Sequence, residues 1–172
     1  LTLALEGPPL TYFRAAMVVG EGSESFRTLY HLANRLPATV APAWLRTRTQ
    51  PIGADDAIAY LRAAPRVPDS AGREVQIGGP DVLSYGDMLR VVARSLGKRE
   101  PAMLPVPLLS PALSSLWIGL VTPVDAGVAR PLIEGLSTAT VVTDRSGAEL
   151  FEVRPIPFRV ARFPEPSRLP FR

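Results

Sequence analysis

A short unit near the start of the chain strongly limits the possible fold: an apolar run, a glycine turn and an amphipathic helix. Residues 10–19 are mostly apolar and lead into Gly20, and Ser23 stands where a helix N-cap belongs. Apolar side chains then recur at helical spacing before Pro37, namely Phe26, Leu29, Tyr30, Ala33 and Leu36. A strand that is apolar along its length indicates burial on both faces of a parallel sheet. The unit therefore predicts an α/β protein.

Two further units follow in the middle of the chain. Residues 38–45 read as a loop or short extended piece, and residues 46–52 as a short strand or an extended binding loop. Asp55 or Asp56 is expected to cap the next helix, which has apolar surface from Ile58, Tyr60, Leu61 and Ala64. A metal or acid/base role for this aspartate pair is the alternative to capping.

The best-defined helix is expected after residue 84. A strand over residues 73–77 is stopped by two glycines and a proline. Ser84 and Asp87 resemble a capping box, and Gly97 suits the position just after the helix. The buried stripe is expected to consist of Met88, Leu89, Val91, Val92 and Leu96.

The last third of the chain is rich in proline. A short strand is expected over residues 103–106, helices from Ser110 and over 126–136, and a β-prone piece at 139–142. Residues 102–124 carry no charge, but four internal prolines interrupt them, so no membrane span is expected. From residue 154 the absence of any period predicts an unpacked tail.

Composition excludes several classes of function. The 172 residues suit one domain of ordinary size, and the net charge of +3 comes from basic residues spread along the chain, so no nucleic-acid partner is expected. The absence of cysteine excludes disulfides and thiolate metal sites, and suits a cytoplasmic protein. His31 is the single histidine, so it is expected to be structural or exposed, and no metal site is predicted.

Two groups of residues are candidates for binding anions. Gly20 and Gly22 precede a helix, where backbone N–H groups favour an anion, although an ordinary strand-to-helix turn is the alternative. On a strand, Arg46, Arg48 and Gln50 would share one face and bind a phosphate or carboxylate; a solvated strand edge is the alternative.

Three stretches, in this order, carry a resemblance to a known superfamily: LTYFRAAMVVGEGS, RTRTQPIGADD and REVQIGGPDVLSYGDMLRVVARSLG. Together they resemble the C-terminal half of atypical and extended short-chain dehydrogenase/reductase proteins, including nucleotide-sugar epimerase-like and NmrA-like NAD(P)-binding proteins. The resemblance implies the late strands of a partial Rossmann-like parallel sheet with a small C-terminal α/β substrate subdomain. We expect residues 1–65 to complete the NAD(P)-binding domain, 66–153 to form the substrate-side subdomain and extension, and 154–172 to form a disordered tail.

The resemblance also assigns residues to the active cleft. It places Ala15, Ala16, Met17 and Gly20 beside the cofactor. With the anion candidates above, the residues expected to contact a small-molecule substrate are Arg14, Gly22, Ser23, Arg46, Arg48 and Gln50. The chain lacks the Gly-rich phosphate loop of the fold, so an N-terminal Rossmann half is expected upstream. We expect NAD or NADP in the full-length parent, and weak or no binding by this chain alone.

Two classes of function remain open at this point. The first is an oxidoreductase or nucleotide-sugar epimerase, of which this chain is the substrate-side portion. The second is a noncatalytic NAD(P)-sensing or assembly protein of the same fold, and an inactive fragment is a third interpretation. The Tyr-x-x-x-Lys pair of short-chain dehydrogenases does not occur in these residues, and it would normally lie upstream of Leu10. The catalytic residues and the substrate therefore stay unassigned.

Overall fold

Short, mainly parallel strand pairs form the framework of the protein. The computed structural model describes residues 7, 9–20, 22–35, 38–41, 43–105 and 135–158. Within them, three parallel pairs are β1 (Tyr12–Ala15) with β6 (Glu74–Ile77), β2 (Val18–Val19) with β5 (Ile52–Gly53), and β3 (Ala38–Ala41) with β8 (Ala102–Pro105). A fourth pair, β4 (Arg48–Thr49) with β7 (Leu83–Ser84), is antiparallel. The fold is mixed α/β with pieces of a partial Rossmann-like sheet, as the sequence predicts.

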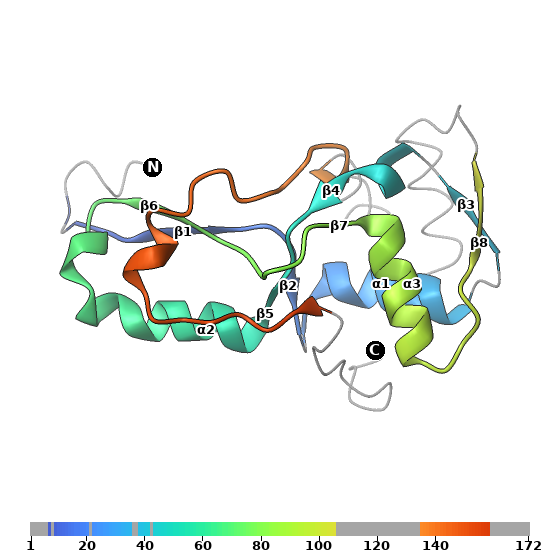
Figure 1. Cartoon of the computed structure of the whole chain (residues 1–172), viewed down its shortest axis with the longest axis horizontal. Coiled ribbons are helices and arrows are strands. Elements are labelled where there is room, and N and C mark those ends of the chain that lie inside the picture. Colours follow the sequence, from blue (N-terminus) through green and yellow to red (C-terminus); the bar gives the residue numbers. More distant parts are fainter. Residues whose placement is uncertain are drawn as a thin grey trace.

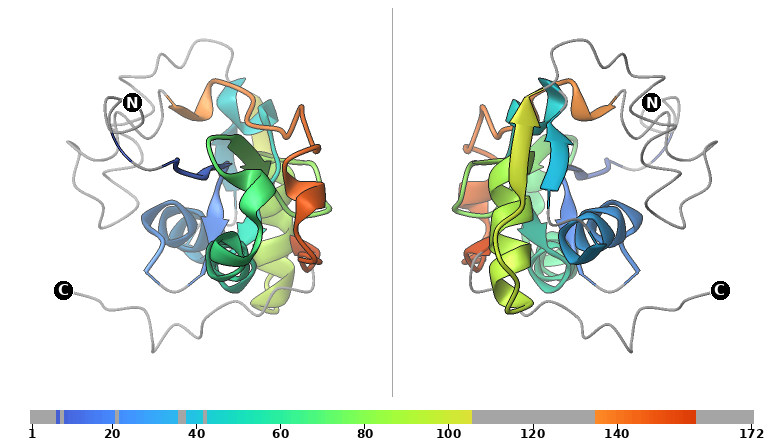
Figure 2. Two further views of the ribbon diagram at one scale, coloured as in Figure 1. Left: turned by 90° about the vertical axis from the view of Figure 1, so that its left-hand side faces the viewer. Right: turned by 90° about the vertical axis from the view of Figure 1, so that its right-hand side faces the viewer.

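Three α-helices accompany the strands: α1 (Glu24–Arg35), α2 (Ala54–Ala63) and α3 (Tyr85–Ser95). Short 3₁₀ turns occur at Ala43–Arg46, Ala64–Arg66, Pro68–Ser70 and Ala148–Leu150. In the end-on views of Figure 2 the three α-helices lie on one side of the strands, whereas the orange chain that follows residue 135 crosses the other side.

Local signals set the start of α1 and both ends of α3 as predicted, whereas Pro37, expected to end the first helix, lies outside the described residues. Ser23 caps α1 by accepting a hydrogen bond from the Phe26 N–H at 3.2 Å. Ser84 and Asp87 form the expected capping box, with side-chain to backbone distances of 3.1 and 3.3 Å. Gly97 follows α3 with a φ of 66°, a left-handed conformation that glycine adopts at low cost.

The expected single strand over residues 10–19 is in fact two strands. The chain bends at Ala16 and Met17, where the Met17 carbonyl accepts a hydrogen bond from the Ile52 N–H at 3.0 Å, and the pairing partner changes from β6 to β5. The predicted burial on both faces is wrong, because Tyr12 is 47% exposed and Val18 36% exposed. Among the described residues only β6 pairs with β1, so one edge of β1 has no strand partner there.

The start of α2 also differs from the prediction. Gly53 is the N-cap and makes no side-chain capping bond, and Asp55 and Asp56 lie in the first turn. The reason is that Gly53 is still paired with Val19 in the β2–β5 register, so the helix begins immediately after the strand. Both carboxylates remain near the helix N-terminus, where negative charge is favourable.

Two hydrophobic clusters form the core. One packs α1 against α3, with Phe26 and Met88 fully buried; His31 of α1 is also buried, at 3% exposure. The other packs Tyr60 of α2 against Val75 of β6. In Figure 1, α2 and β6 lie toward one end of the long axis, and α1 and α3 lie toward the other. Both clusters draw residues from both sides of the boundary expected at residue 65.

The described end of the chain is packed, although the sequence predicts an unpacked tail from residue 154. Phe158 is 4% exposed, its N–H donates to Asp81 Oδ2 at 2.9 Å, and the Ile156 N–H donates to Asp56 Oδ2 at 2.9 Å. The expected helix at Ser110, most of the helix over 126–136 and residues 159–172 lie outside the described residues. No helix in the described part of the chain is both long and apolar enough to span a membrane.

Candidate functional site

The bend between β1 and β2 brings several predicted residues to the carboxyl end of a strand pair. β1 ends at Ala15, opposite Ile77 of β6, and the chain then leaves β6 to pair with β5. Ligands of open α/β sheets bind outside the carboxyl ends of the strands, where neighbouring chains diverge. A pocket of about 340 Å³ lies here, which we call the bend pocket; Arg14, Ala15 and Ala16 line one side of it.

The opposite wall of the bend pocket comes from residues 138–143. They begin a longer segment, residues 138–155, which we call the strap; in Figure 1 it runs above β1 and returns beside α2. Thr140 attaches the strap, because its N–H donates to the Arg48 carbonyl and its own carbonyl accepts from the Gln50 N–H, both at 3.0 Å. The Thr140 hydroxyl also donates to Thr49 Oγ1 at 2.9 Å. The strap is therefore a fixed wall of the site.

Gln50 is part of the framework that holds the strap. Its side chain is almost fully buried, its Nε2 donates to the Gly79 carbonyl at 2.6 Å, and its Oε1 accepts from the Val142 N–H at 3.0 Å. A Cβ on Gly78 would lie 2.9 Å from Gln50 Cγ, and one on Gly79 would lie 2.3 Å from the Pro51 carbonyl oxygen. The two glycines thus permit the close approach that these hydrogen bonds require.

The common face predicted for Arg46, Arg48 and Gln50 does not form. Arg46 ends a 3₁₀ turn and is exposed, Arg48 is exposed on β4, and Gln50 is buried. The strand is only two residues long, so the alternation assumed for residues 46–50 is interrupted. Neither arginine lines the bend pocket.

The remaining predicted residues follow the bend in the chain. Met17 is buried in the α1–α3 cluster, and Ser23 caps α1. A Cβ on Gly20 would lie 2.5 Å from Ala54 Cβ, so this glycine lets the turn approach the start of α2. Gly22 has a φ of 83° and open space around its Cα. These local roles favour the strand-to-helix turn over a phosphate loop at residues 20–25.

Arg14 is the charged group of the bend pocket. Its Nε lies 3.3 Å from Glu74 Oε1, and both side chains are about half exposed. An ion pair this exposed contributes little to stability, because water and salt screen it. The guanidinium is therefore available to exchange Glu74 for a ligand anion at low energetic cost.

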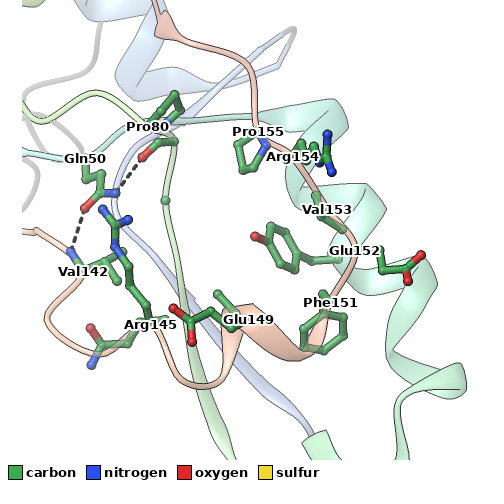
Figure 3. A pocket seen from close by; sticks show the side chains of 15 residues that line it. Gln50, Pro80, Val142, Arg145, Glu149, Phe151, Glu152, Val153, Arg154 and Pro155 are labelled. Carbon is green, nitrogen blue, oxygen red and sulfur yellow. Dashed lines mark hydrogen bonds between the residues drawn. The ribbon is translucent and has the colours of Figure 1, made fainter.

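A second and larger pocket, of about 900 Å³, lies between the strap and β6, and we call it the strap pocket. Its lining includes Gln50, which the sequence singled out, and residues that it did not: Tyr60, Gln76, Arg145 and Glu149. Figure 3 shows Arg145 extending toward Gln50, whereas Glu152 points away from it. No sequence motif marks these residues, because the fold brings strap residues together with residues far away in the sequence. Thr143 and Val142 of the strap bond to Gln76 and Gln50, which are 67 and 92 positions away.

Burial and hydrogen bonding shift two pKa values near the strap pocket. Burial, with a smaller contribution from the Asp56 carboxylate, raises the pKa of Tyr60 above 10.0. A hydrogen bond from the Ser146 N–H lowers the pKa of Asp144 on the strap. Tyr60 is therefore a neutral hydrogen-bond donor at neutral pH. The described residues contain no group of three or more His, Cys, Asp or Glu that could hold a metal ion.

The comparisons with known proteins concern the fold. No protein-family model and no curated protein matches the chain. It is similar to a nucleoside-diphosphate-sugar epimerase from Staphylococcus aureus, with 16% identity over 90% of this chain and 51% of that chain and a TM-score of 0.64. It is also similar to the protein in the crystal structure of gox2253, with 21% identity over 86% of this chain and 44% of that chain and a TM-score of 0.54.

A UDP-glucuronic acid 4-epimerase from Bacillus cereus, crystallised with UDP-glucuronic acid and NAD, is a further match. It has 18% identity over 83% of this chain and 43% of that chain, with a TM-score of 0.46. The chain thus spans about half the length of the Staphylococcus aureus structure, which it covers to 51%. At these identities the similarity shows the partial Rossmann-like fold.

Proposed function

We propose that this chain is the substrate-side portion of an NAD(P)-binding protein of the epimerase or reductase class. The observation that carries the proposal is the bend pocket. It is built from Arg14, Ala15 and Ala16, at the carboxyl end of β1, in a fold similar to that of the Staphylococcus aureus epimerase. This is the part of an α/β sheet where ligands bind.

The residues around the bend fit the nicotinamide side of a dinucleotide. Ala15 and Ala16 present small side chains to the bend pocket, whose volume of about 340 Å³ leaves room for a flat ring. Met17 and Gly20 would support this wall from the core and from the adjoining turn. Bound NAD(P) would supply hydride chemistry, and Arg14 would orient an anionic group of the substrate.

The dinucleotide phosphates would be held by the N-terminal Rossmann half that we expect upstream. The turn after β2 is occupied by capping and close packing, so it is a poor phosphate site. We therefore expect this chain alone to bind NAD(H) or NADP(H) weakly or not at all. A thermal-shift titration of the folded chain measures this, and tight saturable binding would contradict it.

The proposal is tested in the protein extended by that upstream half. Ala16→Leu would fill the bend pocket, and we expect it to weaken cofactor affinity and turnover, whereas Ala71→Leu adds the same atoms at an exposed position. Equal affinity and turnover in the two variants would refute the assignment of the bend pocket. Cofactor binding that depends on Ala16, without turnover of nucleotide sugars or other carbonyl and alcohol substrates, would favour the noncatalytic sensing or assembly class.

A further inference from the structure

The strap pocket has an aromatic floor. Tyr60 and Phe151 are 4% and 5% exposed, and their ring centroids lie 5.5 Å apart at an interplanar angle of 69°. Val153 and Ala148 extend the apolar part of the lining. A volume of about 900 Å³ is in the range of pockets that hold small organic molecules. The floor therefore suits an apolar or aromatic ligand body.

Three hydrogen-bond donors line the same pocket without bonding to any residue that the structure describes: the Arg145 guanidinium, the Tyr60 hydroxyl and the Gln76 Nε2. The Gln76 amide is already oriented, because its Oε1 accepts from the Thr143 N–H at 2.9 Å and from the Thr143 hydroxyl at 3.1 Å. Tyr60 is more than nine-tenths buried as a residue, but its hydroxyl oxygen is not among the buried atoms that lack a partner, so it reaches the open space of the pocket. Arg145 is exposed and Gln76 half-buried, so these donors face the open pocket and can bond to an acceptor that a ligand supplies.

The charges of the lining decide which acceptor fits. A guanidinium forms paired hydrogen bonds with a carboxylate or a phosphate. Glu149 and Glu152 also line the pocket, so their charge offsets that of Arg145 and Arg154 and disfavours a dianion. We propose that the strap pocket binds a small organic monocarboxylate with an aromatic or aliphatic body, held by Arg145 over the Tyr60–Phe151 floor.

This site is separate from the proposed dinucleotide function. The strap pocket shares Gln76 and Val142 with the bend pocket, but Arg14, Ala15 and Ala16 do not line it. All of its residues belong to the described part of this chain. Binding is therefore expected in the 172-residue chain itself, whether or not that chain binds a dinucleotide.

The first experiment is a titration of the ¹⁵N-labelled chain followed by amide chemical shifts. The probes are benzoate, its neutral counterpart benzamide, and inorganic phosphate. We expect saturable shifts with benzoate at an affinity on the order of millimolar, centred on Gly78, Gly79 and Ala148, and binding of benzamide and phosphate about tenfold weaker or less. Phosphate binding tighter than benzoate, or no saturable benzoate binding, would overturn the proposal.

Variants locate the ligand. Arg145→Gln should weaken benzoate binding by about tenfold or more, and Tyr60→Phe by roughly threefold, because each removes one donor. Arg66→Gln removes an exposed arginine outside the pocket and should leave the affinity unchanged. Benzoate affinity that is the same in Arg145→Gln as in Arg66→Gln contradicts the proposal. Tyr60→Phe keeps the ring, so it provides a second test in a folded chain should Arg145→Gln fail to fold.

Discussion

The buried amide of Gln50 makes a quantitative prediction about stability. In Gln50→Leu the side chain keeps a similar size, but the Gly79 carbonyl and the Val142 N–H lose their partners. Leaving a buried backbone group unsatisfied costs about 1–3 kcal/mol, so two such groups cost about 2–6 kcal/mol. Burial of the leucine side chain offsets about 1 kcal/mol of this. The expected loss in the free energy of unfolding is therefore about 1–5 kcal/mol.

Urea denaturation followed by circular dichroism measures the effect. With a slope of about 2 kcal/mol per molar urea, the midpoint should fall by about 0.5–2.5 M. The matched control is Gln76→Leu, which removes the same amide from exposed hydrogen bonds to Thr143 and should cost about 0.5 kcal/mol or less. Equal losses of unfolding free energy in the two variants would show that burial does not determine how much the Gln50 hydrogen bonds contribute to stability.

Three further predictions concern turns and a helix cap. Gly79→Ala should destabilise the protein by about 2–3 kcal/mol, because the new Cβ would lie 2.3 Å from the backbone oxygen of Pro51. Gly97→Ala should cost only about 1 kcal/mol, because the space around it is open and only its φ of 66° is unfavourable for alanine. Thermal denaturation measures both, and a larger loss for Gly97→Ala would contradict this order. Hydrogen bonds from Ser84 lower the pKa of Asp87 below 3.8, so this stabilisation is present above the unfolded pKa and is lost as the pH falls through the folded value. Asp87→Asn should remove the part of the stability that is lost at acid pH. This part is small because the Asp87 side chain is about half exposed. The same dependence of stability on pH in the variant and in the unaltered protein would refute the assignment.

Short-range chemistry made part of this structure predictable. The α3 helix follows from residues a few positions apart: Ser84 and Asp87 at its start and Gly97 just after its end. The β6 strand and the turn after it follow from a β-prone run stopped by two glycines. Arg14, Ala15 and Ala16 are a different case, because the resemblance assigned them to the active cleft while the sequence predicted one strand through residue 19; in the structure they line the bend pocket where β1 ends at Ala15.

Contacts between distant residues account for what the sequence did not predict. The split of the first strand depends on Ile52 replacing a β6 residue as the partner of Val18, and periodicity cannot reveal such a change. The sequence predicted that Gln50 binds a ligand. In the structure, Val142 of the strap, about ninety positions later, packs over Gln50 and bonds to its amide oxygen. Arg145 belongs to no sequence motif, because its position beside Gln50 in the strap pocket results only from the path of the strap.

The strap also has a consequence for how the protein folds. Its anchoring hydrogen bonds join residues 91, 92 and 100 positions apart, from Thr140 to Thr49, Val142 to Gln50 and Ile156 to Asp56. Contacts of such long sequence separation close large loops, and they slow folding because the chain loses entropy before it gains the contact. Both pockets use the strap as a wall, so neither exists until that closure is complete. During synthesis, neither pocket can form until residues 138–155 have left the ribosome and returned to the strands that they line.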